Sequence, residues 1–90
     1  MTRWLAMIIV QQMRAARALL GWKQTDLADA SGVGIATIRR IEAAAGQVTG
    51  AAATLWKLQA ALENAGIEFI APDGTKGPGV RLKRDVDLAL

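Results

Sequence analysis

The stretch from Gln24 to Ile41, QTDLADASGVGIATIRRI, constrains the fold more than any other part of this chain. Its pattern predicts two short helices joined by a tight turn at residues 31–33. Gly32 can adopt the positive φ that an abrupt helix end requires, which costs most other residues energy. Ile38 and Ile41 lie three residues apart and are expected to share the inner face of the second helix. The stretch therefore predicts a pair of crossed helices.

The outer side of the second helix carries short side chains at its start and two cations further along. The residues on this side are Gly34, Ile35, Ala36, Thr37, Arg39 and Arg40. A face of this kind lets a partner approach closely at one end and offers positive charge at the other.

These residues resemble the Xre/Cro-repressor type of bacterial and phage helix-turn-helix domain over roughly residues 12–62. The matching positions are Gln24 at the start of the first helix, Ala28 four residues later, Gly32 four after that, and Val33, Ile38 and Ile41 in the apolar slots. The chain departs from the family at Ser31, where an apolar residue or Ala is usual. It also departs at Lys23, where a capping Ser, Thr or Asn would be worth roughly 1 kcal/mol. A helical hairpin in an unrelated bundle is the alternative, which the combined register disfavours.

Arg17 and Glu42 are expected to form a partly buried ion pair. Arg17 lies on the inner edge of the helix expected before this motif, and Glu42 lies four residues after Ile38 on the inner edge of the second helix. A charge at an inner edge needs a partner. Members of the resembled family often pair an Arg and a Glu at these two positions. Two separately solvated charges are the alternative.

Two further helices are predicted on either side of the motif. The first runs from about Gln11 to Leu20 and ends at Gly21. The preceding residues 2–10 fit either an extension of that helix or a strand, and helix is slightly favoured. The last helix is expected to begin at a Thr49 cap after a loop over residues 43–50 and to run to about Ala65. Its expected core residues are Leu55, Leu58 and Leu62, with Trp56 half-buried beside them, while Trp22 is expected to cover the core near the first helix.

The hydrophobic period then changes to two, at residues 67–70 and again at 80–83, around a segment dense in Pro, Gly and Asp. This pattern predicts a β-hairpin over residues 66–84, which either packs on the helices or pairs with a second subunit. The expected fold class is therefore mainly α: a four-helix, repressor-like helix-turn-helix domain followed by a C-terminal β-hairpin. The 90 residues are expected to form one domain, with a helical core at 12–65, the motif at 24–42 and an N-terminal extension at 1–9.

Composition excludes several classes of function. The chain has no Cys and no His, so disulfides, thiol nucleophiles, imidazole bases and the usual zinc ligands are absent. Its carboxylates show no recognisable catalytic spacing, so neither an enzyme nor a cofactor is expected. The apolar run at 4–10 is too short for a membrane span, and a cytoplasmic location is expected.

The net charge of +3 is weak evidence for a nucleic-acid partner, but its distribution is stronger evidence. Basic residues gather in the helix-turn-helix half at Arg14, Arg17, Lys23, Arg39 and Arg40, and again near the end at Arg81, Lys83 and Arg84. Phosphate contacts are expected from Lys23, Gln24 and Thr37, and base contacts from Gly34, Ile35, Ala36, Arg39 and Arg40. The alternative for the last two arginines is a solvated basic face that gives only phosphate affinity.

The resemblance and the charge pattern together predict a sequence-specific regulator of transcription that binds double-stranded DNA. The resemblance implies a repressor or autoregulator of the kind found in phages, plasmids and conjugative elements. It also implies a homodimer on a two-fold operator whose half-sites lie roughly 34 Å apart. The N-terminal extension, the hairpin edge and the last helix are three candidate dimer surfaces. A protein-interaction module, antitoxin-like or antiactivator, is the alternative function.

Overall fold

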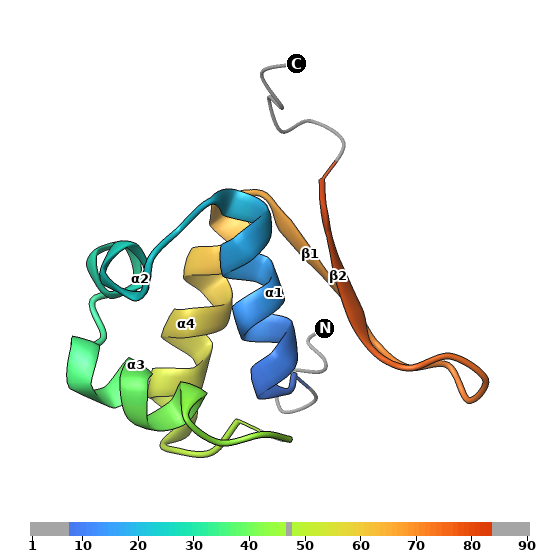
Figure 1. The fold of residues 1–90 in the computed structure, drawn as a ribbon, viewed down its shortest axis with the longest axis horizontal. Helices are drawn as coiled ribbons and strands as arrows, with labels where there is room; N and C mark the ends of the chain where they lie inside the picture. The colour runs from blue at the N-terminus through green and yellow to red at the C-terminus, as the bar shows by residue number, and fades with distance from the viewer. Residues whose placement is uncertain (1–7, 47, 84–90) are drawn as a thin grey trace.

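Four helices followed by a two-stranded hairpin make up the described part of the chain, residues 8–46 and 48–83, in this computed structural model (Figure 1). The elements are α1 (Val10–Leu20), α2 (Gln24–Ser31), α3 (Ile35–Glu42), α4 (Ala52–Asn64), β1 (Ile67–Ile70) and β2 (Gly79–Leu82). This is the mainly α fold class that the sequence predicts. No helix in these residues is long and apolar enough to cross a membrane.

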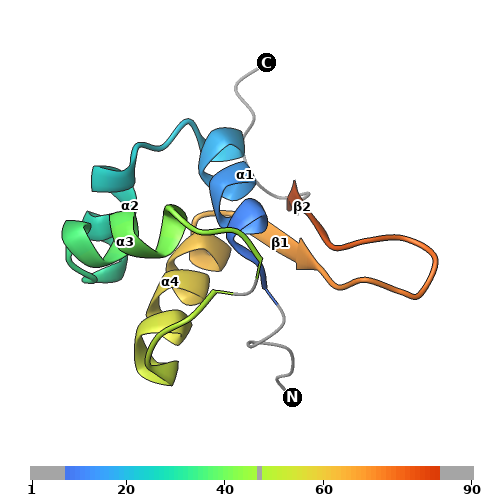
Figure 2. The same cartoon turned by 60° about the horizontal axis from the view of Figure 1, so that its bottom comes forward.

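One cluster of buried apolar side chains joins the four helices to β1. Its members are Ile8, Val10, Met13, Ala16, Leu27, Val33, Ile38, Ile41, Val48, Leu58, Ala61, Leu62, Ile67 and Phe69. The α2–α3 pair and the hairpin lie on opposite sides of α1 and α4 (Figures 1 and 2). The helix-turn-helix is therefore exposed on one side of the molecule and the hairpin on the other.

α1 begins at Val10, so the expected helical extension is wrong for Ile8 and Ile9. Ile9 has extended backbone at φ −115° and ψ 163°, and its N–H donates to the Gln12 side chain at 2.9 Å. Val10 N–H donates to Gly46 O at 2.7 Å, which ties the start of α1 to the loop after α3. Ile8 and Ile9 are thus placed by backbone contacts with that loop rather than by a helix. Residues 2–7 of that expectation lie outside the described residues.

The turn between α2 and α3 spans residues 32–34, because Ser31 is still helical. Gly32 adopts φ +76°, as its predicted role at the helix end requires. Ser31 Oγ accepts a hydrogen bond from Val33 N–H at 3.1 Å. The residue that departs from the family pattern therefore stabilises the turn. Leu27 and Ile38 are fully buried beneath it.

The expectation that Thr49 caps α4 is wrong. The N-cap is Ala51, which has no side-chain hydrogen-bonding group, and Thr49 is exposed in the loop. α4 ends at Asn64, one residue before the expected end. Leu58 and Leu62 are buried as predicted, whereas Leu55 is only partly buried and Trp56 has 52% of its surface exposed.

The hairpin packs on the helices, which is one of the two expected arrangements. β1 and β2 pair antiparallel, with Ile67 opposite Leu82 and Phe69 opposite Val80. Ile67 and Phe69 are buried in the core cluster. The buried Gln12 amide of α1 donates to Ile70 O at 3.3 Å and to Gly79 O at 2.9 Å, so one side chain holds both strands against α1.

Candidate nucleic-acid interface

An ion pair fixes the end of α3 against α1. Arg17 Nε lies 3.0 Å from Glu42 Oε2, and Arg17 Nη2 lies 2.6 Å from Glu42 Oε1. The two side chains are 16% and 2% exposed. A carboxylate this deeply buried is stable only when its lone pairs are matched by donors, and the forked guanidinium supplies two. Sequence reasoning expected this pair.

Two more side chains converge on the same residue. Gln24 Nε2 donates to Glu42 Oε1 at 3.1 Å, which ties the start of α2 to the end of α3. Arg14 Nη1 donates to the Glu42 backbone carbonyl at 2.7 Å, where a cation also complements the negative end of the α3 dipole. Two of the arginines in the helix-turn-helix half of the chain, Arg14 and Arg17, thus stabilise the fold through Glu42.

The outward side of α3 carries the cations that remain. Ala36, Arg39 and Arg40 are exposed, and no ion pair involves either arginine among the described residues. Ala36 and Arg40 are four residues apart and lie opposite the buried Ile38 around the helix. A small side chain and a long cationic one therefore share one outward line.

The start of α2 presents a second polar feature. Lys23 is the exposed N-cap, and its N–H is already bound by Asp26 Oδ2 at 2.8 Å. The amides of Gln24 and Thr25 have no acceptor among the described residues. Free amides at a helix N-terminus favour an anion. Thr37, expected to contact phosphate, lies partly exposed in the first turn of α3.

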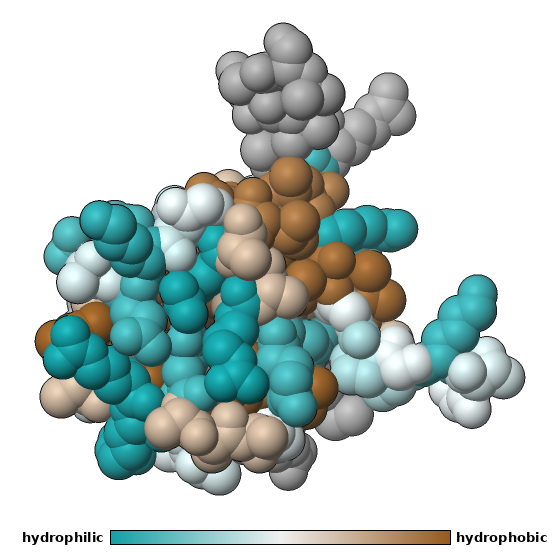
Figure 3. Space-filling model, viewed as in Figure 1, coloured by the Kyte–Doolittle hydropathy of each residue, from teal (hydrophilic) through white to brown (hydrophobic). Residues whose placement is uncertain are grey.

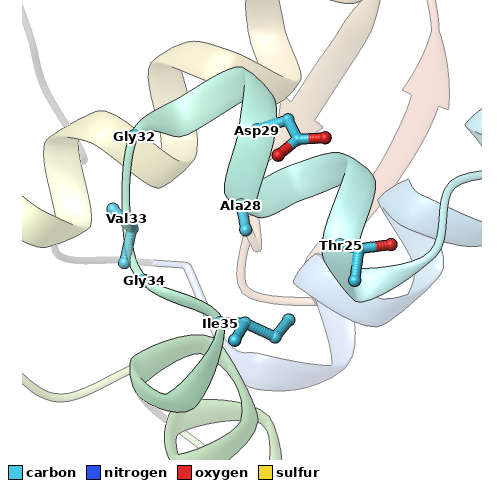
Figure 4. A pocket seen from close by; sticks show the side chains of 7 residues that line it. All are labelled: Thr25, Ala28, Asp29, Gly32, Val33, Gly34 and Ile35. Carbon is cyan, nitrogen blue, oxygen red and sulfur yellow. The ribbon is translucent and has the colours of Figure 1, made fainter.

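A shallow hollow lies between α2 and the start of α3 (Figure 4). It is lined by Thr25, Ala28, Asp29, Gly32, Val33, Gly34 and Ile35. Ala28, Val33 and Ile35 make an apolar floor that suits a methyl group. The Thr25 hydroxyl can donate a hydrogen bond to a ligand or accept one from it, and the Asp29 carboxylate can accept one. Sequence reasoning missed Thr25 and Asp29 because it assigned contacts on this helix only to its start, at Lys23 and Gln24, and otherwise considered its inner side. Their spacing of four residues was the available signal.

The structure spreads the expected contact residues along one face instead of gathering them in a pocket. Gly34 and Ile35 lie at the hollow, and Ala36, Arg39 and Arg40 follow along α3. Gln24 lies at the other end, beside Glu42. Such an extended surface suits an extended polyanion better than a small ligand. No group of three or more acidic side chains that could hold a metal ion occurs in the part of the chain that the structure describes.

The sequence model of the helix-turn-helix family matches residues 13–64, which contain α1 from its fourth residue onward, α2, α3 and all of α4. Neither a curated protein nor a solved structure matches the chain.

Proposed function

Because this chain belongs to the Xre/Cro-type helix-turn-helix family of DNA-binding regulators, we propose that it is a sequence-specific repressor or autoregulator. It acts as a homodimer on a two-fold operator in double-stranded DNA. The observation that carries this proposal is the contrast between the arginines. Arg14 and Arg17 are bound to Glu42, whereas Arg39 and Arg40 project from α3 with no ion-pair partner among the described residues. Unpaired cations beside small outward residues are suited to a DNA groove.

In the proposed complex, α3 enters the major groove with its N-terminal half nearest the bases. Gly34 and Ala36 allow the backbone to approach closely. Ile35, which lines the hollow, contacts a thymine methyl group. Arg40 reads a guanine through O6 and N7, and Arg39 flanks it.

Phosphates are held by Lys23, Thr37 and the free amides at the start of α2. Gln24 contributes to this set through its backbone N–H, because one side-chain N–H is bound to Glu42. These contacts set the position of the protein on the duplex without reading sequence.

The test is binding of the purified chain to the DNA upstream of its own gene and to random DNA of the same length. We expect tighter binding to the upstream DNA, with an affinity that falls steeply as salt rises because phosphate contacts release counterions. Equal affinity for both DNAs would contradict sequence specificity. No binding to either DNA at low salt would favour a protein-interaction module on this fold.

A further inference from the structure

Among residues 8–46 and 48–83, β2 has one strand neighbour, and its other edge is open. Its partner β1 lies antiparallel, with Ile67 opposite Leu82. Lys83 N–H donates to Gly66 O at 2.7 Å. From that point along the ladder, opposite residues alternate between hydrogen-bonded and non-hydrogen-bonded pairs, and Leu82 and Val80 belong to the non-hydrogen-bonded ones. The N–H and C=O groups of Val80 and Leu82 therefore point away from β1. No described residue forms a hydrogen bond with these four groups.

The charged side chains near β2 do not protect this edge. Arg81 lies on the outer face of the hairpin, where its Nε is 2.8 Å from Glu68 Oε1 on β1. Lys83 Nζ donates to Glu63 O at the end of α4, at 2.8 Å. Both cations are thus directed back over β1 and α4. Natural proteins usually block an open strand edge with charge, Pro or a covering element, and an unblocked edge pairs readily with another strand.

Apolar side chains border the open edge. Val80 and Leu82 are only partly buried, on the side of the hairpin that faces α1. Ala15 and Leu19 are exposed on the side of α1 that carries Gln12, and Leu19 has 43% of its surface accessible. We call these four residues, Ala15, Leu19, Val80 and Leu82, the α1–β2 strip. Figure 3 shows apolar atoms gathered between the upper end of α1 and β2.

A groove continues the strip toward the hairpin loop. Gln11, Gln12 and Ala15 line it from α1, and Pro78, Gly79 and Val80 line it from the hairpin. An open strand edge, an apolar strip and a groove are therefore continuous on one side of the molecule.

We propose that the α1–β2 strip and the open edge of β2 form the homodimer interface, with β2 pairing antiparallel to β2 of a second copy. A two-fold axis at Arg81 places Val80 of each copy opposite Leu82 of the other. The four outward-facing backbone groups of Val80 and Leu82 in each copy then bind the same four groups of its partner. The two Arg81 residues face each other across the axis, and each guanidinium group is directed away from it, toward Glu68 of its own copy.

The second copy is the occupant because the edge is complementary to itself. A closed two-fold interface uses the same patch on both subunits, and this patch supplies two donors, two acceptors and matching apolar neighbours. The interface would join two hairpins into a four-stranded sheet with the two Leu19 side chains packed over it. The inference specifies the dimer of the proposed function. It is compatible with DNA binding because α3 lies on the opposite side of the molecule (Figures 1 and 2).

The first experiment measures self-association of the full chain by sedimentation, without DNA. Leu19→Lys places a charge in the proposed interface and should weaken dimerisation about tenfold or more. Trp56→Lys is the matched control, because Trp56 is the other large apolar side chain exposed in the described residues and lies on α4. It should leave the dimer affinity unchanged. Circular dichroism should give the same helix content for both variants, since both side chains are exposed.

The second experiment tests the strand register by oxidation. The chain has no cysteine, so Arg81→Cys introduces a single thiol at the proposed axis. Directly opposite residues in an antiparallel pair have Cβ atoms about 4.5–5.5 Å apart, close to the separation a disulfide needs. Arg81→Cys should form a covalent dimer rapidly on mild oxidation, and Trp56→Cys should not.

Several outcomes would overturn the proposal. One is a wild-type chain that stays monomeric at about 100 μM, where an interface of micromolar affinity is saturated. Another is an unchanged dimer for Leu19→Lys, or dissociation by Trp56→Lys alone. Failure of Arg81→Cys to cross-link would exclude the proposed register and thus the interface as stated. Because none of these measurements contains DNA, they can fail while the specific DNA complex is still observed.

Discussion

At the scale of single residues, Glu42 is the most tightly bound side chain in the helix-turn-helix. It receives two hydrogen bonds from Arg17 and one from Gln24. Arg17→Ala should destabilise the fold by about 1–3 kcal/mol, because a carboxylate that is 2% exposed loses its charged partner. Urea unfolding of the wild type and the variant measures this difference.

A double-mutant cycle separates the ion pair from simple truncation. Arg17→Ala combined with Glu42→Ala should cost less than the sum of the single changes. Arg14→Ala is the matched control, because Arg14 binds the Glu42 backbone carbonyl, which Glu42→Ala retains. Its cycle with Glu42→Ala should be close to additive. Additivity in both cycles would show that the Arg17 contact contributes no coupling energy.

Arg40 and Lys23 should differ in the kind of DNA contact they make. Arg40→Ala should weaken binding to the specific site by about 1–3 kcal/mol and binding to random DNA much less, because a base contact is lost. Lys23→Ala should weaken both alike and lower the salt slope by about one unit, because a phosphate contact carries no sequence information. Titrations of both variants at several salt concentrations measure this. Equal losses on both DNAs for Arg40→Ala would make it a phosphate contact and shift base reading to Arg39.

At the scale of elements, two exposed carboxylates of the hairpin accept hydrogen bonds that favour their ionised forms. The hydrogen bond from Arg81 lowers the pKa of Glu68 below its usual 4.5, and the backbone N–H groups of Lys76 and Thr75 lower the pKa of Asp73 below its usual 3.8. Because the folded pKa values are depressed, their stabilisation is present above the usual values and is lost as pH falls through the folded ones. Below these values we expect weaker protection of the β1 and β2 amides from exchange, relative to the intrinsic exchange rate at each pH.

An NMR titration of the side-chain carboxyl groups measures the pKa values of Glu68 and Asp73 directly. Glu68→Gln is the control, since it removes the charge and should abolish the part of the pH dependence that belongs to the Arg81 contact. A Glu68 pKa at or above 4.5 would contradict the prediction.

Periodicity predicted the elements well wherever local sequence decides them. Gly21 and Gly32 ended their helices as expected, since positive φ favours glycine, and the alternation at 67–70 gave β1. The start of α1 and the cap of α4 could not be predicted in this way. Ile9 is held extended by backbone bonds between its neighbours and the loop after α3, and Thr49 is displaced from the α4 start by two residues of irregular loop. Both are decided by contacts distant in sequence.

The residues of the α2–α3 face were predictable to a similar degree as the helices and strands. The outward residues of α3 follow from the helix period once Ile38 is known to face inward. The hydrogen bond between Gln24 and Glu42 and the hollow with Asp29 arise only when α2 crosses α3, so no single-helix pattern contains them.

At the scale of the whole molecule, the proposed DNA-binding face and the proposed dimer edge are separated by α1 and α4. The α2–α3 face lies on one side and the open edge of β2 on the other (Figure 1). A dimer through β2 therefore leaves both α3 helices free and relates them by a two-fold axis. Since the hairpin is held to α1 by the buried Gln12, the two recognition faces should keep a defined separation.

A defined separation makes binding sensitive to the phase of the operator. Inserting about five base pairs between the half-sites turns one of them to the opposite face of the duplex, because a DNA turn takes about 10.5 base pairs. We expect the affinity of the dimer to fall at least tenfold, toward that for a single half-site, since only one α3 can then reach its groove. Inserting about ten base pairs restores the face but lengthens the span, so it should not restore full affinity if the four-stranded sheet is rigid.

Gel-shift titrations of the three operators measure these differences, with Leu19→Lys as the control that should bind all three alike. Equal affinity of the wild-type chain for the original and the five-pair operators would mean that each subunit binds its half-site independently.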